Sequence, residues 1–86
     1  MTKTNKGGTD MVTKTVKLSQ ILDVYEFVKV VTGYEGEVDI ISGRYRVNAK
    51  SVMGIFALDL TQPLTVEIHG GDCDKLLSEL APFEVE

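Results

Sequence analysis

The sequence predicts an α+β fold, an open-faced β-sandwich in which helices cover one face of a four-stranded antiparallel sheet. Two patterns lead to this fold class. Apolar and polar residues alternate in four short segments, as in strands that keep one face wet. Other segments repeat apolar residues every three or four positions, as in helices that bury one side. The order of these segments along the chain is βαββαβα.

The chain is long enough for one domain. Folding of a chain of 86 residues buries about 60% of its surface, so a single compact core is expected. We assign residues 12–86 to this domain. Residues 1–11 are assigned to a flexible N-terminal tail, because the first ten residues carry no periodic apolar signal.

Residues 12–18 alternate between apolar and polar and predict the first strand, although Lys14 interrupts its apolar face. Ser19 is positioned to cap the helix that follows by accepting a hydrogen bond from a free N–H group. The many valines of this segment would also suit a strand. Gly33 is expected to end the helix in the left-handed conformation. The apolar side of the helix is predicted to consist of Ile21, Val24, Val28 and Val31.

Residues 38–49 predict a β-hairpin, because two alternating segments flank the turn signal Ser42-Gly43. Residues 64–69 alternate in the same way and form the fourth strand, with His69 on its outward side. Asp72 is expected to cap a last helix that ends near Pro82. The buried side of that helix is predicted to consist of Cys73, Leu76, Leu77 and Leu80.

The net charge of −4 argues against nucleic acid as a partner. No apolar run approaches the roughly 18 residues that span a bilayer, and no signal peptide opens the chain, so a cytoplasmic protein is expected. The single cysteine, Cys73, excludes an internal disulfide and a cysteine-built metal site. The chain has no second histidine, and its sequence shows no carboxylate cluster close to His69. We therefore expect no metal or catalytic role for His69. A solvated, mixed-charge surface is expected on the wet sheet face from Lys14, Lys17, Arg44, Arg46, Glu37, Asp39 and Glu67.

Residues 47–54, Val-Asn-Ala-Lys-Ser-Val-Met-Gly, carry the most specific motif of the chain. This stretch resembles the segment around the regulatory serine of HPr, the small phosphocarrier of the bacterial sugar phosphotransferase system. The likeness resumes in residues 57–62 and at Gly70-Gly71-Asp72, where the family has a Gly-x-Asp turn. The element order expected above also resembles that of HPr. Residues 12–46 match the family only in pattern and spacing.

Members of the HPr family that carry phosphate have a Gly-x-His-Ala-Arg-Pro-Ala motif where the first helix begins, and the histidine takes the phosphate. Counting back from Ser51 without gaps places Gln20 at that histidine position and Asp23 at the proline. A glutamine amide is not nucleophilic, and a carboxylate repels a phosphoryl group. The resemblance therefore implies a diverged member without phosphocarrier chemistry. We expect a protein that is not an enzyme, with no catalytic residue, cofactor or metal.

A glutamine in place of the histidine, with the serine retained, resembles the catabolite-repression HPr-like subgroup. Those proteins are phosphorylated on the serine by a bifunctional kinase/phosphorylase and then bind a transcriptional regulator. This chain departs from the subgroup, because Leu22 and Asp23 replace its arginine and proline. The resemblance implies that Ser51 is a regulatory phosphorylation site. The residues alone favour Ser51 as the N-cap of a short helix, and the same cap geometry accommodates a phosphate.

The short helical segment after Ser51 has more apolar residues than one side of two turns can bury. Ile55 and Leu58 are expected in the core, which leaves Val52, Met53 and Phe56 partly exposed. The matching positions of HPr form its docking patch, so the resemblance implies that these three residues bind a partner. A covering loop or tail, or self-association into a homodimer, is the alternative.

Three functions stay open. The first is a regulatory or adaptor protein of the phosphotransferase system, switched by phosphorylation of Ser51. Its partners would be an HPr kinase/phosphorylase, a transcriptional regulator or other phosphotransferase-system proteins, and neither nucleic acid nor a membrane. The second is a phosphocarrier that uses His69, the only histidine of the chain. The third is a diverged structural module with no role in sugar transport.

Overall fold

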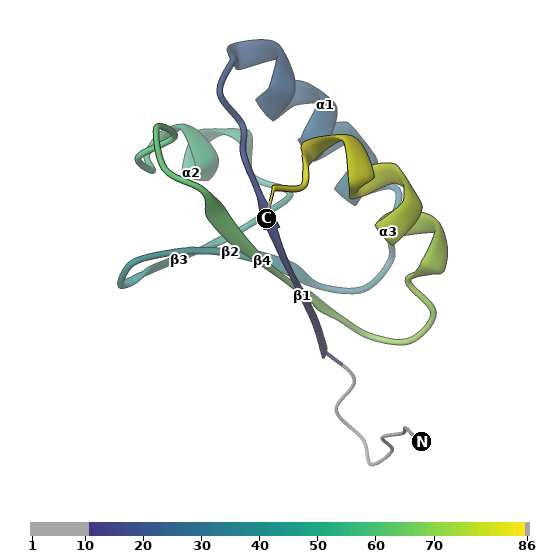
Figure 1. Cartoon of the computed structure of the whole chain (residues 1–86). Helices are drawn as coiled ribbons and strands as arrows, with labels where there is room; N and C mark the ends of the chain where they lie inside the picture. The colour runs from purple at the N-terminus through teal and green to yellow at the C-terminus, as the bar shows by residue number, and fades with distance from the viewer. Residues whose placement is uncertain (1–10, 86) are drawn as a thin grey trace.

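The computed structural model describes residues 11–85 and confirms the predicted fold class and element order (Figure 1). The sheet contains β1 (Met11–Val16), β2 (Val38–Ser42), β3 (Tyr45–Asn48) and β4 (Leu64–His69). The helices are α1 (Ile21–Thr32), α2 (Val52–Phe56) and α3 (Asp74–Leu80), followed by the 3₁₀ helix η1 (Ala81–Phe83). Residues 1–10 of the expected tail lie outside the described residues. Met11, also assigned to the tail, instead pairs with His69 in β1.

The strands are ordered β1-β4-β2-β3, and every neighbouring pair is antiparallel. Figure 1 shows α1 and α3 over one face of the sheet, with α2 beside the beginning of α1. The opposite face carries no helix within residues 11–85. The predicted turn at Ser42-Gly43 joins β2 to β3, and Gly43 adopts a positive φ of 61° there.

The core lies between the helices and one face of the sheet. In β4 the apolar residues are buried and the polar residues between them are half-buried, which is the predicted alternation. The ring of Phe27 packs edge-on against that of Phe83, with the centroids 5.9 Å apart. Burying a side chain of this size contributes about 1.5–3 kcal/mol. The fully buried residues come from both layers: Val16, Leu18, Val24, Phe27, Val31, Val38, Ile40, Ala49, Ile55, Leu64, Val66, Ile68 and Leu80.

The buried side of α1 differs from the prediction. Val24 and Val31 are buried as expected, but Ile21 is 65% exposed and Val28 is only half-buried. Phe27 takes their place in the core. It lies three residues after Val24 and four before Val31, so it fits the same helical periodicity. The periodicity allowed both sets of residues, and the larger ring occupies the core.

Both ends of α1 also correct the prediction. The N-cap is Gln20 and not Ser19, so the helix begins one residue later than expected. Gly33 has a φ of −73° and is therefore right-handed, not left-handed. Its N–H donates to the carbonyl oxygen of Val30 at 3.2 Å. The last turn thus tightens into an i→i−3 pattern, which needs no left-handed residue.

The last helix keeps its predicted place with a different cap. Cys73 is the N-cap of α3, one residue after the predicted Asp72. The Oδ1 atom of Asp72 still accepts a hydrogen bond from the N–H of Asp74 at 3.1 Å, so its carboxylate holds the turn before the helix. Two leucines expected in the core are only half-buried and pack against it: Leu58, which lies two residues beyond the end of α2, and Leu77, in the middle of α3.

Lys14 lies on the apolar side of β1, as the strand alternation indicated, and not on the wet sheet face with which it was also grouped. Side chains alternate along a strand, so Lys14 lies on the same side of β1 as the buried Val16. Its Nζ atom is 3.9 Å from Oε1 of Glu84, beyond the edge of β1. Within residues 11–85, no helix is both long and apolar enough to cross a membrane.

Candidate functional site

The loop before α2 fixes the position of Ser51. The side-chain oxygen of Asn48 accepts a hydrogen bond from the N–H of Lys50 at 2.8 Å, and its carbonyl oxygen accepts one from Ser51 at 3.0 Å. The ammonium group of Lys50 donates to the carbonyl oxygen of Tyr34 at 2.7 Å, so this cation is engaged away from the serine. The loop therefore has little freedom at the residue that precedes α2.

Ser51 caps α2 as predicted. Its Oγ atom accepts a hydrogen bond from the N–H of Gly54 at 3.1 Å, and the residue is exposed. A Cβ atom at Gly54 would lie 3.2 Å from this Oγ atom and 3.4 Å from Cβ of Val47. The glycine therefore makes room for the side chains of Ser51 and Val47. Ile55 is fully buried and anchors the helix.

The beginning of α1 lies next to α2 and has a different chemistry. The N–H of Gln20 donates to Oδ2 of Asp23 at 3.1 Å, and the hydroxyl of Ser19 lies 3.5 Å from the same oxygen. The carboxylate of Asp23 therefore lies in the first turn of α1, where its negative charge also interacts favourably with the positive end of the helix dipole. Gln20 is exposed. Its side chain is an uncharged amide at the entrance of the helix.

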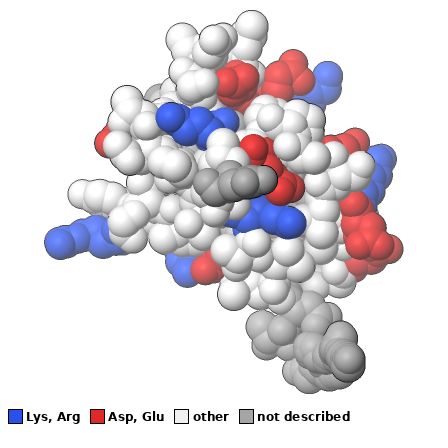
Figure 2. Space-filling model, in the orientation of Figure 1, with Lys and Arg blue, Asp and Glu red and all other residues white. Residues whose placement is uncertain are grey.

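Exposed apolar side chains from both helices form one surface. We call it the α1–α2 surface and define it as Ile21, Leu22, Tyr25, Met53 and Phe56. Met53 is 81% exposed and Leu22 is 71% exposed, so neither contributes to the core. Figure 2 shows uncharged residues at the end of the molecule where α1 begins. Val52, expected in this group, is half-buried and packs against the core.

One aromatic contact joins the two halves of the α1–α2 surface. The rings of Tyr25 and Phe56 pack edge to face, with centroids 5.9 Å apart and an interplanar angle of 67°. Because each ring is still at least one-third exposed, the pair holds the two helices together and also presents apolar area to solvent. This contact connects the exposed apolar residues of α1 with those of α2.

A second group of side chains lies on the opposite face of the sheet. We call Asp39, Arg46, Glu67 and His69 the outer-face cluster. The guanidinium nitrogen Nη1 of Arg46 lies 3.0 Å from Oδ2 of Asp39 and 2.9 Å from Oε1 of Glu67. These hydrogen bonds raise the pKa of Arg46 above its ordinary value, and the bond to Glu67 has the larger effect. Arg46, Asp39 and Glu67 thus bring both signs of charge together on the wet face, where the sequence predicted a mixed-charge surface.

His69 lies on the outward side of β4 as predicted, but the premise that it has no carboxylates nearby is wrong. Its Nε2 atom is 3.6 Å from Oε1 of Glu67 and 3.8 Å from Oδ2 of Asp39. Asp39 is directly opposite Glu67 in the β2–β4 ladder, while His69 is two residues further along β4. Strand parity indicated the shared face, but only the register of β2 against β4 brings these three residues together.

Cys73 is buried as expected, at the start of α3. Burial raises the pKa of its thiol, and the nearby charge of Asp74 adds to the effect. The hydroxyl of Tyr34 donates to the carbonyl oxygen of His69 at 2.8 Å, and burial likewise raises the pKa of this phenol. Neither group is poised as a nucleophile, because both are held in their neutral forms.

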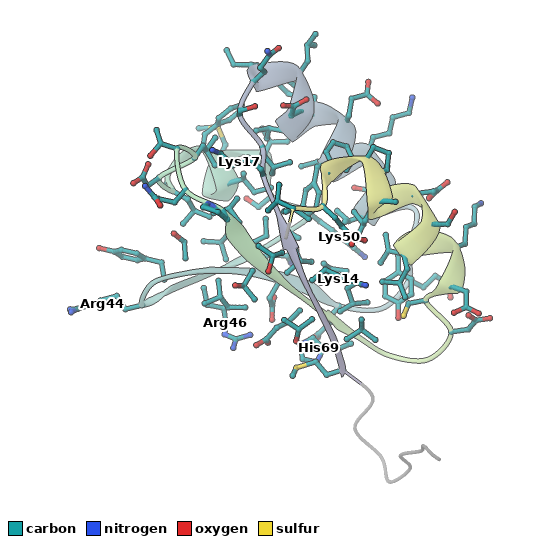
Figure 3. The ribbon with its side chains drawn as sticks, in the orientation of Figure 1. Lys14, Lys17, Arg44, Arg46, Lys50 and His69 are labelled. Carbon is teal, nitrogen blue, oxygen red and sulfur yellow. The ribbon has the colours of Figure 1, made fainter. Side chains whose placement is uncertain are left out.

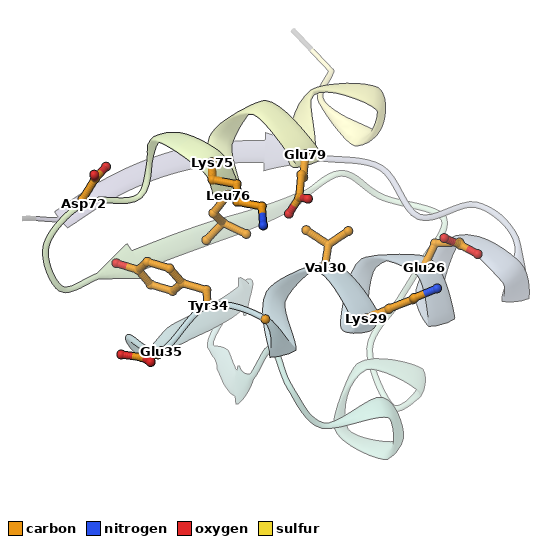
Figure 4. Close-up of a pocket in the computed structure, with 10 residues that line it drawn as sticks. Glu26, Lys29, Val30, Tyr34, Glu35, Asp72, Lys75, Leu76 and Glu79 are labelled. Carbon is orange, nitrogen blue, oxygen red and sulfur yellow. The ribbon is translucent and has the colours of Figure 1, made fainter.

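A groove of about 590 Å³ lies between α1 and α3 (Figure 4). Its wall carries four carboxylates, from Glu26, Glu35, Asp72 and Glu79, and two ammonium groups, from Lys29 and Lys75. The groove is therefore acidic on balance.

Sequence reasoning found the α2 half of the α1–α2 surface and missed the α1 half. Met53 and Phe56 were expected to be exposed, whereas Ile21 was placed in the core and Leu22 and Tyr25 were not singled out. A signal was present. The segment from residue 21 to residue 31 contains more apolar residues than one helical stripe can bury, so some of them had to face solvent.

Comparisons with known proteins agree with this fold. The family model described as "PTS HPr component phosphorylation site" matches residues 13–83. The crystal structure of a phosphocarrier protein HPr from Bacillus anthracis str. Ames is similar with a TM-score of 0.69 and 29% identity, over 87% of this chain and 98% of that chain. The crystal structure of HPr-C-His from Thermoanaerobacter tengcongensis has a TM-score of 0.64 and 24% identity, over 85% and 88% of the two chains, which shows the fold alone. No curated protein matches the chain.

Proposed function

Because this chain belongs to the HPr family, we propose that it serves the sugar phosphotransferase system by binding other proteins and does not itself carry phosphate. The observation that carries the proposal is the composition of the α1–α2 surface. An uncharged, non-nucleophilic Gln20 caps α1, and exposed Ile21 and Leu22 follow it. Such a surface suits recognition of an apolar partner surface better than it suits transfer of an anion.

The first turn of α1 is poorly suited to hold a phosphoryl group. A phosphate at a helix N-terminus is bound by free backbone N–H groups and by the positive helix end. Here the N–H of Gln20 already donates to Asp23, and that carboxylate brings a negative charge to the same place. An incoming phosphoryl group would meet both a competing acceptor and charge repulsion. This supports a regulatory or adaptor protein without catalytic activity.

The expected partners are proteins with an exposed apolar patch. Met53 and Leu22 are the most exposed members of this surface, and the Tyr25–Phe56 pair supplies aromatic area. Aromatic and methionine side chains are enriched in protein interfaces. An HPr kinase/phosphorylase, a transcriptional regulator and other phosphotransferase-system proteins are the candidates that family membership favours. Self-association into a homodimer would use the same surface.

Phosphorylation of Ser51 would switch this binding. Ser51 is exposed and directly precedes α2, so a phosphate on its Oγ atom would lie beside the α1–α2 surface. The phosphate would add about −1.5 to −2 charges. The capping oxygen would become part of the phosphate ester, and its hydrogen bond from Gly54 would pass to a charged group near the positive helix end. A partner would thus meet a charged edge next to an apolar patch.

The alternative of phosphate transfer through His69 has little support. The imidazole lies on the sheet face away from the helices, and its Nε2 atom faces two carboxylates at 3.6 and 3.8 Å. A phosphoryl group on that atom would be repelled by both. A diverged structural module is the remaining alternative, and the exposed α1–α2 surface disfavours it because such a module would gain nothing from exposing five large apolar side chains.

The proposal is tested with the purified chain and proteins from the same host. Incubation with the host HPr kinase/phosphorylase and nucleoside triphosphate should add one phosphate, detected by intact mass, and Ser51→Ala should abolish it. Phosphoenolpyruvate and the first enzyme of the system should leave the chain unlabelled. Rapid, acid-labile phosphorylation that passes on to a sugar permease would overturn the proposal.

Binding is tested by pull-down from the host lysate. Leu22→Asp and Met53→Asp place a charge on the α1–α2 surface without touching the core, and both should lose the captured proteins. Tyr45→Asp is the matched control, because Tyr45 is 65% exposed and lies in β3, outside that surface. Equal loss in all three variants, or in none, would contradict the assignment of the surface.

A further inference from the structure

The outer-face cluster has a built geometry that the proposed function does not use. Asp39 in β2 is directly opposite Glu67 in β4, and Glu67 and His69 are two residues apart on the same side of β4. Figure 3 shows Arg46 and His69 on the side of the sheet that faces away from the helices. Hydrogen-bonded neighbouring strands fix the backbone of all three potential ligand residues. Their positions therefore depend on the sheet and not on a loop.

The cluster converges on two oxygen atoms. Oδ2 of Asp39 and Oε1 of Glu67 are the same atoms that approach both Arg46 and His69. One ligand atom from each of Asp39, Glu67 and His69 can be chosen so that all three lie within 4.8 Å of one another. Ligand atoms that share an ion at about 2.0–2.2 Å are about 3.0–3.5 Å apart. The 3.6 and 3.8 Å separations from the imidazole nitrogen are close to that range, so small side-chain rotations would complete a binding site.

A cation already occupies the space between the carboxylates. The Nη1 atom of Arg46 makes hydrogen bonds to both, at 3.0 and 2.9 Å. The side chain of Arg46 is 53% exposed, whereas those of Asp39, Glu67 and His69 are less exposed. The guanidinium can therefore turn into solvent without disturbing the strands. A divalent ion in its place would meet the same two oxygens with twice the charge and would add the imidazole nitrogen.

We propose that Asp39, Glu67 and His69 form a binding site for one divalent first-row transition-metal ion such as Zn²⁺, and that Arg46 occupies the site in the absence of the ion. One imidazole nitrogen and two carboxylate oxygens suit Zn²⁺ and its neighbours, while Mg²⁺ and Ca²⁺ prefer oxygen ligands alone. Three protein ligands leave room for water or for a donor from another molecule. The ion would link β2 to β4 on the side that carries no helix among the described residues.

The test is calorimetric titration of the full chain with ZnCl₂. One ion should bind per chain, and binding should raise the unfolding temperature, because the ligands come together only in the folded state. Asp39→Asn and His69→Ala should each weaken binding at least tenfold. Arg46→Gln should bind more tightly than the wild type, because the competing cation is gone. Circular dichroism checks that each variant is folded.

Two controls separate this site from other metal-binding groups. Cys73→Ser should bind Zn²⁺ like the wild type, and the Co²⁺ complex should lack the absorption of a cobalt–thiolate bond, since Cys73 is buried and outside the cluster. MgCl₂ should not compete. No Zn²⁺ binding by the wild type, binding unchanged by His69→Ala, or binding lost in Cys73→Ser would each overturn the proposal. A result of the first kind would leave the outer-face cluster as an ion-pair network only.

Discussion

The α1–α2 surface and the outer-face cluster lie on opposite sides of the sheet and meet solvent in opposite ways. The first exposes large apolar side chains, and covering them would be favourable because it removes apolar area from water. The second gathers charged groups that already satisfy one another, through Arg46 between Asp39 and Glu67. A large exposed apolar surface of this kind is typical of a site that binds another molecule. The carboxylates of the outer-face cluster already have a cationic partner in Arg46. A ligand would therefore have to be a cation that binds them more strongly than the guanidinium does, and the proposed ligand is for that reason a metal ion.

The largest change in the free energy of unfolding is expected for α1, where a buried and an exposed residue should differ most. Phe27→Ala removes a fully buried ring and should lower the free energy of unfolding by about 3–5 kcal/mol. Leu22→Ala, five residues earlier on the exposed side, should change it by less than about 0.5 kcal/mol. Urea unfolding measures both. Comparable losses would mean that the α1–α2 surface is covered within the molecule, and its assignment as a docking surface would be wrong.

A smaller effect should follow from the cap of α2. Ser51→Ala removes the hydrogen bond to the N–H of Gly54 and should cost about 1 kcal/mol, even without any kinase. Ser51→Asn, which keeps a capping oxygen but cannot be phosphorylated in the same way, should recover most of that loss. This pair distinguishes the structural role of Ser51 from the proposed regulatory role. Equal stability of Ser51→Ala and wild type would show that the cap contributes nothing.

The pH dependence should come from two groups that belong to neither region, the Cys73 thiol and the Tyr34 phenol. Burial raises the pKa of the Cys73 thiol above 9.0 and that of the Tyr34 phenol above 10.0. The stability that these neutral groups contribute is fully present below their unfolded pKa values and is lost as the pH rises through their folded values. Urea unfolding between about pH 8 and about pH 11 should show this decline. A double variant with Cys73→Ser and Tyr34→Phe should decline less, and an unchanged decline would contradict the burial of these groups.

The smallest effect is expected at the outer-face cluster. Arg46→Gln removes the shared hydrogen bonds to two carboxylates on an exposed face, where ion pairs contribute little to stability. The unfolding midpoint should fall slightly at low ionic strength and match that of the wild type in about 1 M NaCl, where charges are screened. A large loss that persists in high salt would show that Arg46 acts through packing, and the view that it yields easily to a metal ion would fail.

Most of the fold followed from periodicity. Strand parity predicted that Val66 and Ile68 lie in the core and that His69 lies on the outward side, because alternation in a strand is a strict geometric rule. Helical periodicity was less decisive, since two overlapping stripes fit α1. In the structure Phe27 is buried and Ile21 is exposed, because close packing beneath the helix accommodates the ring of Phe27.

The two functional regions differ in how much of each was visible in the sequence. The motif around Ser51 identified α2 and its exposed residues, because the motif and the helix are contiguous in the chain. The outer-face cluster combines residues from β2, β3 and β4, and no spacing in the sequence encodes which residue of one strand faces which residue of another. The premise about His69 was wrong for that reason.

By itself the sequence determined the order of the elements, the inner and outer side of each strand, the cap at Ser51 and the absence of a histidine at the start of α1. These are local properties, set by side-chain chemistry and by the repeat of the backbone. The tertiary structure alone decided that Tyr25 meets Phe56 and that Asp39, Glu67 and His69 converge. Contacts of this kind depend on strand register and helix packing, which the whole chain settles together when the core closes.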